Sequence, residues 1–169
     1  MTQYLLLGFA DESRLLACVG EEIGRAEQLV TFNGASFDLP LLRTRFRMHR
    51  LDDPIEHCSH DDLLPWARRN RGVDWPNARL QTIERHGIGF ERIDDLPGHE
   101  VPETWRRWLQ HRDGVALPRV LEHNRLDLVT LAVIDELADR GIAFAAHAAT
   151  PTRADRSRQV FQRGHGNGL

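Results

Sequence analysis

A chain of 169 residues, 41% of them apolar, is long enough for one domain with a substantial core. Its net charge of −3 excludes a protein-wide basic field, so any nucleic-acid binding must use local patches. Two cysteines make no disulfide framework, which favours a cytoplasmic protein. The sequence shows no signal peptide and no stretch near the roughly 20 apolar residues of a membrane span, so we expect no membrane partner.

The first half of the chain alternates between strand and helix patterns. Apolar residues recur on one face between residues 11 and 26, which predicts a helix. The run Gln28–Phe32 is rich in β-forming residues, and the Asn33-Gly34 turn should end it. The expected order is a strand at residues 3–9, a helix at 11–26, a strand at 28–32 and a helix at about 38–49.

The second half predicts one more strand and several helices. Residues 55–60 favour a strand that leads into a short helix through Ala67, and the polar segment after it favours a loop at 68–77. Pro118 should lie in the first turn of the longest helix, where its missing N–H costs little. This order indicates an α/β sheet domain. The helices expected here span residues 79–86, 102–112 and 115–140.

The apolar pattern fades from about residue 145. Residues 150–169 contain four Arg and one Asp, with three Gly near the end. We therefore expect residues 1–145 to form the domain and residues 146–169 to form a disordered tail.

The first candidate for chemistry is the segment TFNGASFDLPLL at residues 31–42. Asp38 opens a helix just after a strand, and sites in α/β sheets form beyond the carboxyl ends of strands. Asp38 is therefore well placed to hold a cation. On local grounds alone we favour a plain helix cap, with Pro40 beside it in the first turn.

The second candidate is the segment EHNRLDLVTL at residues 122–131. His123 and Asp127 are four residues apart on a predicted helix, so they share a face. That face also carries apolar residues and should point inward, where an Asp needs a partner or a metal. The alternative is a hydrogen-bonded pair at the margin of the core. A zinc site from His57, Cys58 and His60 is less favoured, because zinc needs about four well-placed ligands.

Together the two segments resemble the second and third exonuclease motifs of DnaQ-like 3′–5′ exonucleases. Three intervening segments are similar to the YprB-like branch of this ribonuclease-H-like family, and the resemblance runs from about residue 3 to residue 137. It implies an α/β fold with a ribonuclease-H-like mixed sheet flanked by helices. The three segments are HDDLL at residues 60–64, LQTIE at 80–84 and RIDDLPG at 92–98.

The resemblance also implies a chemistry, namely hydrolysis of nucleic-acid phosphodiesters at a single-stranded 3′ end. Two Mg²⁺ or Mn²⁺ ions would be held by four acidic residues. Carried over by position, Asp38 and Asp127 would be metal ligands and His123 would activate the water, although this His-to-Asp spacing belongs to a branch that uses Tyr. The Arg side chains after Asp38 could meet phosphates, or equally form a solvated face. The residues expected at the substrate are Asn33, Phe37 and Arg43.

The first motif of the family, Asp-x-Glu on the first strand, does not occur in these 169 residues. The resemblance places it about two strands ahead of residues 3–9, so the sheet should lack its first two strands. A missing segment or a partner would then complete the sheet. Two carboxylates instead of four should hold Mg²⁺ weakly.

Two functions therefore remain open. One is a metal-dependent exonuclease-like domain, incomplete in this chain; the other is a non-catalytic nucleic-acid-binding or protein-interaction module on the same fold. In either case we expect the carboxylates of Asp38 and Asp127 to lie within about 10 Å of each other, close enough to flank a metal pair.

Overall fold

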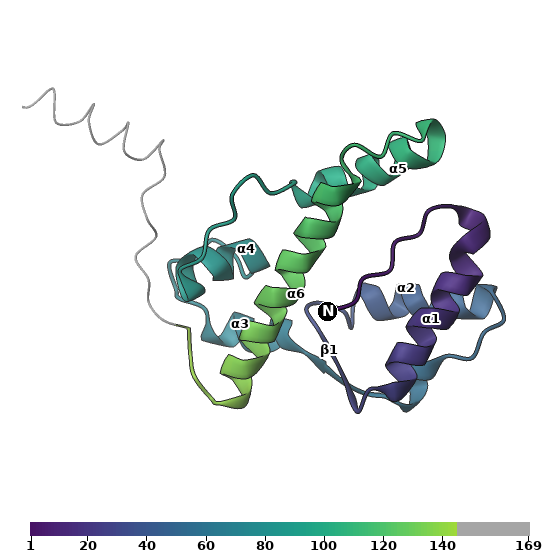
Figure 1. Cartoon of the computed structure of the whole chain (residues 1–169). Coiled ribbons are helices and arrows are strands. Elements are labelled where there is room, and N and C mark those ends of the chain that lie inside the picture. The colour runs from purple at the N-terminus through teal and green to yellow at the C-terminus, as the bar shows by residue number, and fades with distance from the viewer. Residues whose placement is uncertain (145–169) are drawn as a thin grey trace, which may run out of the picture.

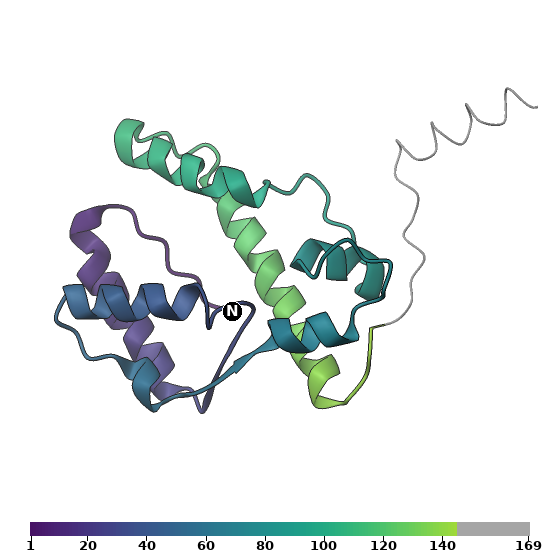
Figure 2. The ribbon, with the colours of Figure 1, turned by 180° about the vertical axis from the view of Figure 1, so that it is seen from behind.

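The computed structural model describes residues 1–144, so the expected tail at 146–169 lies outside the described residues. Two short parallel strands lie between two groups of helices (Figures 1 and 2). The elements, in chain order, are the 3₁₀ turn η1 (Phe9–Asp11), α1 (Glu12–Arg25), β1 (Gln28–Thr31), α2 (Asp38–Met48), the 3₁₀ turn η2 (Pro54–His57), β2 (Ser59–Asp62), α3 (Leu63–Asn70), α4 (Leu80–Ile83), the π turn η3 (Glu84–Ile88), the 3₁₀ turn η4 (Gly98–Glu100), α5 (Val101–His111) and α6 (Leu117–Asp139).

The strands β1 and β2 pair in parallel, in a register that runs from Gln28 opposite Ser59 to Thr31 opposite Asp62. The helix α2 makes the crossover between them. Successive side chains of a strand point to opposite faces of the sheet, and here that alternation divides the core in two.

On one face of the sheet, Leu29 packs against a cluster built from α1, α2 and η2. Phe46, 1% exposed, is its largest fully buried side chain. Glu12 at the start of α1 also holds α2 by accepting hydrogen bonds from Arg45. The buried members of this cluster are Leu16, Ile23, Leu39, Phe46 and Ile55.

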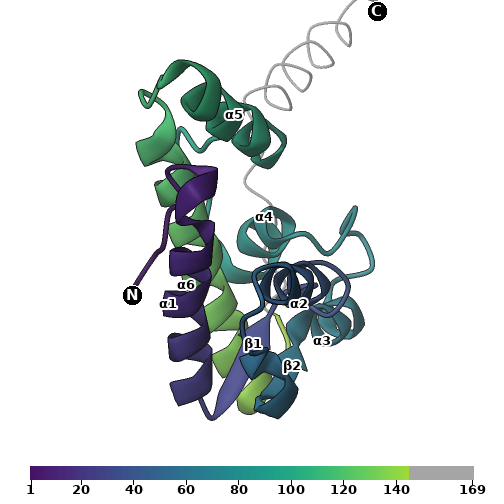
Figure 3. The ribbon, with the colours of Figure 1, turned by 90° about the vertical axis from the view of Figure 1, so that its right-hand side faces the viewer.

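On the other face, Val30 packs against a second cluster built from α3, α4 and α6. Figure 1 shows α3 and α4 on the side of the strands away from α1 and α2. The helix α5 lies at the end of the molecule away from the strands (Figure 3). The buried members of this second cluster are Leu63, Ala67, Trp75, Ile83 and Ile134.

The α/β class predicted from the sequence is confirmed, and α1, β1, α2, α5 and α6 begin and end within two residues of the predicted bounds. Pro118 lies in the first turn of α6, as expected. None of the helices in residues 1–144 combines the length and apolar character that a bilayer span requires.

The strand predicted at residues 3–9 is wrong, because residues 1–7 have no regular structure. Their apolar side chains fit a strand pattern, but the carbonyl groups of Leu6 and Leu7 bind side chains of α5 instead of a neighbouring strand. The indole N–H groups of Trp105 and Trp108 donate to the carbonyl oxygens of Leu6 and Leu7 at 3.0 and 2.9 Å.

The third strand is also displaced, because β2 begins at Ser59 and not at residue 55. Asp53 accepts a hydrogen bond from the Ile55 N–H at 3.0 Å, and Pro54 sits in the first position of the resulting 3₁₀ turn. This local turn uses the backbone donors that a strand would need. The predicted loop at 68–77 begins later, after α3 ends at Asn70, and the predicted helix at 79–86 divides into α4 and η3.

Replacing Phe46 with Ala should lower the free energy of unfolding by about 3–5 kcal/mol, because the change leaves a cavity at the centre of the first cluster. The matched control is Met48→Ala on the same helix, because Met48 is 64% exposed and the effect should stay within about 0.5 kcal/mol. Urea unfolding monitored by circular dichroism measures both. Equal effects of the two changes would contradict this placement of α2.

Candidate active site

An open cavity of about 680 Å³ lies where the end of β1 meets α3, α6 and the segments before α4 and α5. Three of the site residues predicted from the sequence line it, namely Asn33, His123 and Asp127. Asn33 follows β1, whereas the other two lie on α6, so the fold joins the two sequence segments at this cavity. Its other lining residues are Phe32, Leu64, Arg68, Asn77, Ala78, Arg79, Leu80, Gln81, Pro97, Gly98 and His99.

The loop after β1 is fixed by the carboxylate of Asp62, the last residue of β2. This carboxylate accepts hydrogen bonds from the backbone N–H groups of Asn33 at 2.7 Å and Ala35 at 3.1 Å. It also caps α3 by accepting from the Leu64 N–H at 3.1 Å. Asn33 has a positive φ of 67°, which Asn tolerates better than most residues. A Cβ at Gly34 would fall 2.4 Å from the Thr31 hydroxyl oxygen, so only glycine fits there.

His123 and Asp127 lie one turn apart on α6, as the spacing predicted. The Nε2 atom of His123 is 3.6 Å from Oδ2 of Asp127. The other ring nitrogen, Nδ1, lies 2.9 Å from both carboxylate oxygens of Asp95. The His123 side chain is 14% exposed and that of Asp127 is 36% exposed, so solvent and ligands can reach Asp127 more easily.

The third charged residue of the site is Arg92, whose side chain is only 4% exposed. Its guanidinium group donates to Glu84 at 2.5 and 2.7 Å, to Asp95 at 3.1 Å and to Asp127 at 2.6 Å. Thr130 of α6 donates a further hydrogen bond to Glu84. We call these five residues the Arg92 network. It joins the segment from α4 to residue 95 with α6.

The charged side chains of the Arg92 network stabilise the ionised forms of one another. Desolvation alone would lower the pKa of Arg92, but hydrogen bonds to Glu84 and Asp127 raise it above the ordinary value. Desolvation alone would raise the pKa of Asp95, but hydrogen bonds from Arg92 and His123 outweigh it and lower that pKa. Arg92 is therefore a permanent cation, and Asp95 is an anion at neutral pH.

The other three predicted site residues lie outside the lining of this cavity. Asp38 is the first residue of α2; partial desolvation and the nearby charge of Asp62 raise its pKa. Phe37 is 67% exposed. Arg43 forms an ion pair with Asp53 at 3.7 Å. The closeness of the Asp38 and Asp127 carboxylates stays a prediction.

The side chains of residues 1–144 do not fit a complete two-metal centre. No three His, Cys, Asp or Glu side chains in that range are arranged to hold a metal ion. One oxygen of Asp127 is already bound by Arg92. The alternative zinc site is not assembled in that range either, because His60 contacts the Thr31 hydroxyl at 2.8 Å and Cys58 contacts the Ala26 carbonyl at 3.8 Å.

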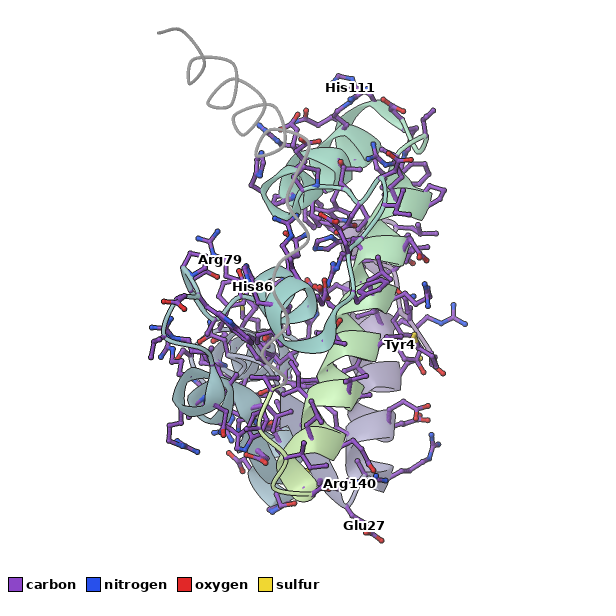
Figure 4. The ribbon with its side chains drawn as sticks, turned by 90° about the vertical axis from the view of Figure 1, so that its left-hand side faces the viewer. Tyr4, Glu27, Arg79, His86, His111 and Arg140 are labelled. Carbon is purple, nitrogen blue, oxygen red and sulfur yellow. The ribbon has the colours of Figure 1, made fainter. Side chains whose placement is uncertain are left out.

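Sequence reasoning missed two arginines that line the cavity, Arg68 at the end of α3 and Arg79 just before α4. Both are exposed, and neither forms an ion pair with another described residue. Arg79 is visible at the outer edge of the molecule in Figure 4. Arg68 begins the segment predicted as a loop, and Arg79 begins the short helix predicted after it, so neither residue stands within a periodic pattern long enough to show that it faces a site.

Comparisons with known proteins find a family model and two relatives that this chain resembles. A family model of the RNase_H superfamily matches residues 1–138. The chain is 31% identical over 121 residues to the uncharacterized protein YprB of Bacillus subtilis (strain 168), which covers 71% of this chain and 29% of YprB. It is 27% identical over 113 residues to the catalytic subunit of DNA polymerase epsilon from Saccharomyces cerevisiae, covering 57% of this chain and 5% of the polymerase. The chain thus spans less than a third of the length of either relative, and no solved structure matches it.

Replacing Arg92 with Met should lower the free energy of unfolding by about 3–5 kcal/mol, because the Glu84 carboxylate, 2% exposed, would lose its counter-charge. The matched control is Arg125→Met, which removes an arginine that pairs with Glu122 in solvent on α6, and it should change stability very little. Chemical denaturation at pH 7 compares the two. A small effect of Arg92→Met would show that the network is replaceable.

Proposed function

The chain belongs to the RNase H superfamily, and on this premise we propose that it is a 3′–5′ exonuclease-like domain for nucleic-acid phosphodiesters. One observation carries the proposal: His123 and Asp127 share a cavity with the loop after β1 and with two exposed arginines. A base, a carboxylate and cations around one open cavity match the needs of phosphodiester hydrolysis. The family membership and the resemblance of the motifs support the assignment.

We assign the roles by residue. His123 would take the proton of the attacking water, since histidine is the usual general base near neutral pH. Asp127 and Asp38 would each supply a carboxylate to Mg²⁺ or Mn²⁺. The pKa of Asp38 is raised first by partial desolvation and then by the charge of Asp62, and a cation bound nearby would favour the charged carboxylate against both. Since these residues do not complete a two-metal centre, further carboxylates must be added for full activity.

The substrate we propose is a single strand whose 3′ end enters the cavity. Arg68 and Arg79 would bind its phosphates, which gives a local basic patch on a protein of net charge −3. Asn33 at the cavity and Phe37 at the surface would lie beside the terminal nucleotides. The two cysteines are free thiols, in keeping with a cytoplasmic setting.

A second candidate is a nucleic-acid-binding or interaction module without catalysis. The contact between Arg92 and Asp127 favours it, because a carboxylate held by a buried arginine is a poorer metal ligand. Binding of a single strand without cleavage, in the presence of Mn²⁺, would support this candidate over the exonuclease.

We expect the 169-residue chain to show little or no cleavage with Mg²⁺ or Mn²⁺, and the same chain extended ahead of Met1 by an Asp-x-Glu strand to be active. Generating the nucleophile and stabilising the leaving oxygen each contribute several kcal/mol in such sites. Since about 1.4 kcal/mol is tenfold in rate, the difference should reach several orders of magnitude.

The assay follows a single strand, labelled so that loss of its 3′ nucleotides is visible, with Asp38→Ala and Asp127→Ala as controls. Both substitutions should abolish the activity of the extended chain. Robust cleavage by the 169-residue chain, lost in Asp38→Ala, would show that other residues replace the Asp-x-Glu motif.

Replacing Arg68 or Arg79 with Ala should weaken single-strand binding and reduce the salt dependence of the affinity by roughly one unit of slope each. The control is Arg25→Ala, which removes an arginine that pairs with Glu21 and Glu22 on α1 and does not line the cavity. Fluorescence anisotropy with a labelled oligonucleotide at several salt concentrations measures the slopes. An unchanged slope in both cavity variants would remove these residues from the interface.

A further inference from the structure

The carboxylate of Asp95 contacts the imidazole ring of His123. Asp95 comes from the segment before α5, 28 residues away in the sequence, yet both of its carboxylate oxygens lie 2.9 Å from Nδ1 of His123. The Asp95 side chain is 8% exposed and that of His123 is 14% exposed. This is a close contact in a largely desolvated setting, where a hydrogen bond is stronger than it is in water.

The carboxylate of Asp95 also accepts hydrogen bonds from two side chains other than His123. Its Oδ2 atom accepts from Arg92 at 3.1 Å and from the side-chain amide of Gln81 at 3.2 Å. Both partners are donors only at these atoms, so they require an acceptor at this position. The lowered pKa of Asp95 agrees with a carboxylate that stays charged.

A carboxylate can only accept, so the nitrogen that faces it must carry the proton. The proton of neutral His123 then lies on Nδ1, and Nε2 keeps its lone pair. Nε2 points to the side of Asp127, 3.6 Å from Oδ2, on the face of α6 that lines the cavity. The contact with Asp95 thus selects the form of His123 whose basic nitrogen faces the cavity.

We propose that Asp95 is a positioning residue that fixes the tautomer and the ring orientation of His123, with Arg92 and Gln81 fixing Asp95 in turn. The proposal rests on the proposed function of this site for its catalytic meaning. In that reaction the attacking water would give a proton to Nε2, its oxygen would bond to phosphorus, and the bond from phosphorus to the 3′ oxygen would break, with that oxygen taking a proton from solvent. His123 would then be doubly protonated, and Asp95 would stabilise its charge.

The substitution Asp95→Asn tests the proposal sharply. Arg92 and Gln81 both donate toward Oδ2, so the amide oxygen should occupy that place and the amide NH₂ should replace Oδ1. The NH₂ group would then face Nδ1 of His123, while the amide oxygen in the place of Oδ2 would still lie within reach of the same nitrogen. The ring proton should therefore shift in part from Nδ1 to Nε2, so that the general base faces the cavity with a proton already bound in a share of the molecules.

Nitrogen-15 NMR of the imidazole rings in the full 169-residue chain reads the tautomer directly, and His123→Gln identifies the signals of His123. At a pH where the ring is neutral, wild type should show a protonated Nδ1 and an unprotonated Nε2. Asp95→Asn should move the two patterns toward each other, because only one of the two atoms that face Nδ1 can still accept its proton. Asp94→Asn is the matched control: Asp94 is the exposed neighbour, and its positive φ of 54° suits Asn.

A protonated Nε2 in wild type would overturn the proposal, and so would an unchanged tautomer in folded Asp95→Asn. If Asp95→Asn does not fold, the wild-type spectrum alone still decides. In a chain that cleaves, kcat should fall with the share of His123 that carries its proton on Nε2, by up to about 10⁴-fold, with little change in KM. The tautomer is measured without substrate, so absence of cleavage in every form would end the proposed function and leave this inference standing.

Discussion

The site depends on the hydrogen bonds between the buried guanidinium group of Arg92 and the carboxylates around it. A guanidinium group that is 4% exposed is stable only if hydrogen-bonded carboxylates surround it, and Glu84, Asp95 and Asp127 supply them. Two of these come from the segment that follows α3, and the third comes from α6. The network therefore determines where that segment lies against α6, and with it the shape of the cavity and the position of His123.

The same network places a constraint on function. One oxygen of the Asp127 carboxylate accepts a hydrogen bond from Arg92, which leaves the other oxygen for a second partner. Arg92 neutralises part of the negative charge that would attract a divalent cation, yet it also keeps Asp127 in place on a helix face that solvent reaches. A metal can bind strongly here only if other carboxylates add enough attraction to outweigh that effect. In an exonuclease, such carboxylates would complete the metal site. In a binding module without catalysis, they would be absent.

The sequence correctly predicted the helices, the strand and the residue spacing that depend on local periodicity. The apolar face of α1, the β-forming run of β1 and the four-residue spacing of His123 and Asp127 each depend on neighbours within a few positions. The strand predicted at residues 3–9 failed because a strand needs a partner strand, and here the indoles of α5 bind its carbonyls instead. The contacts of Arg92 and Asp95 with α6 span 28 to 35 residues, so no local pattern could indicate them.

The sheet itself contributes little to stability, because two parallel strands of four residues form few hydrogen bonds and are marginal alone. What holds them is the packing on both faces, with Leu29 in one cluster and Val30 in the other. Parallel sheets usually have both faces covered, and here β1 supplies the apolar side chains, since β2 has the polar sequence SHDD. In residues 1–144 each strand has a single neighbour, so the edge of β1 away from β2 keeps unpaired backbone groups. A strand that added its own carboxylates at that edge would extend the sheet and add ligands to the proposed metal site at once, because the carboxyl end of β1 leads directly to Asn33 and the cavity.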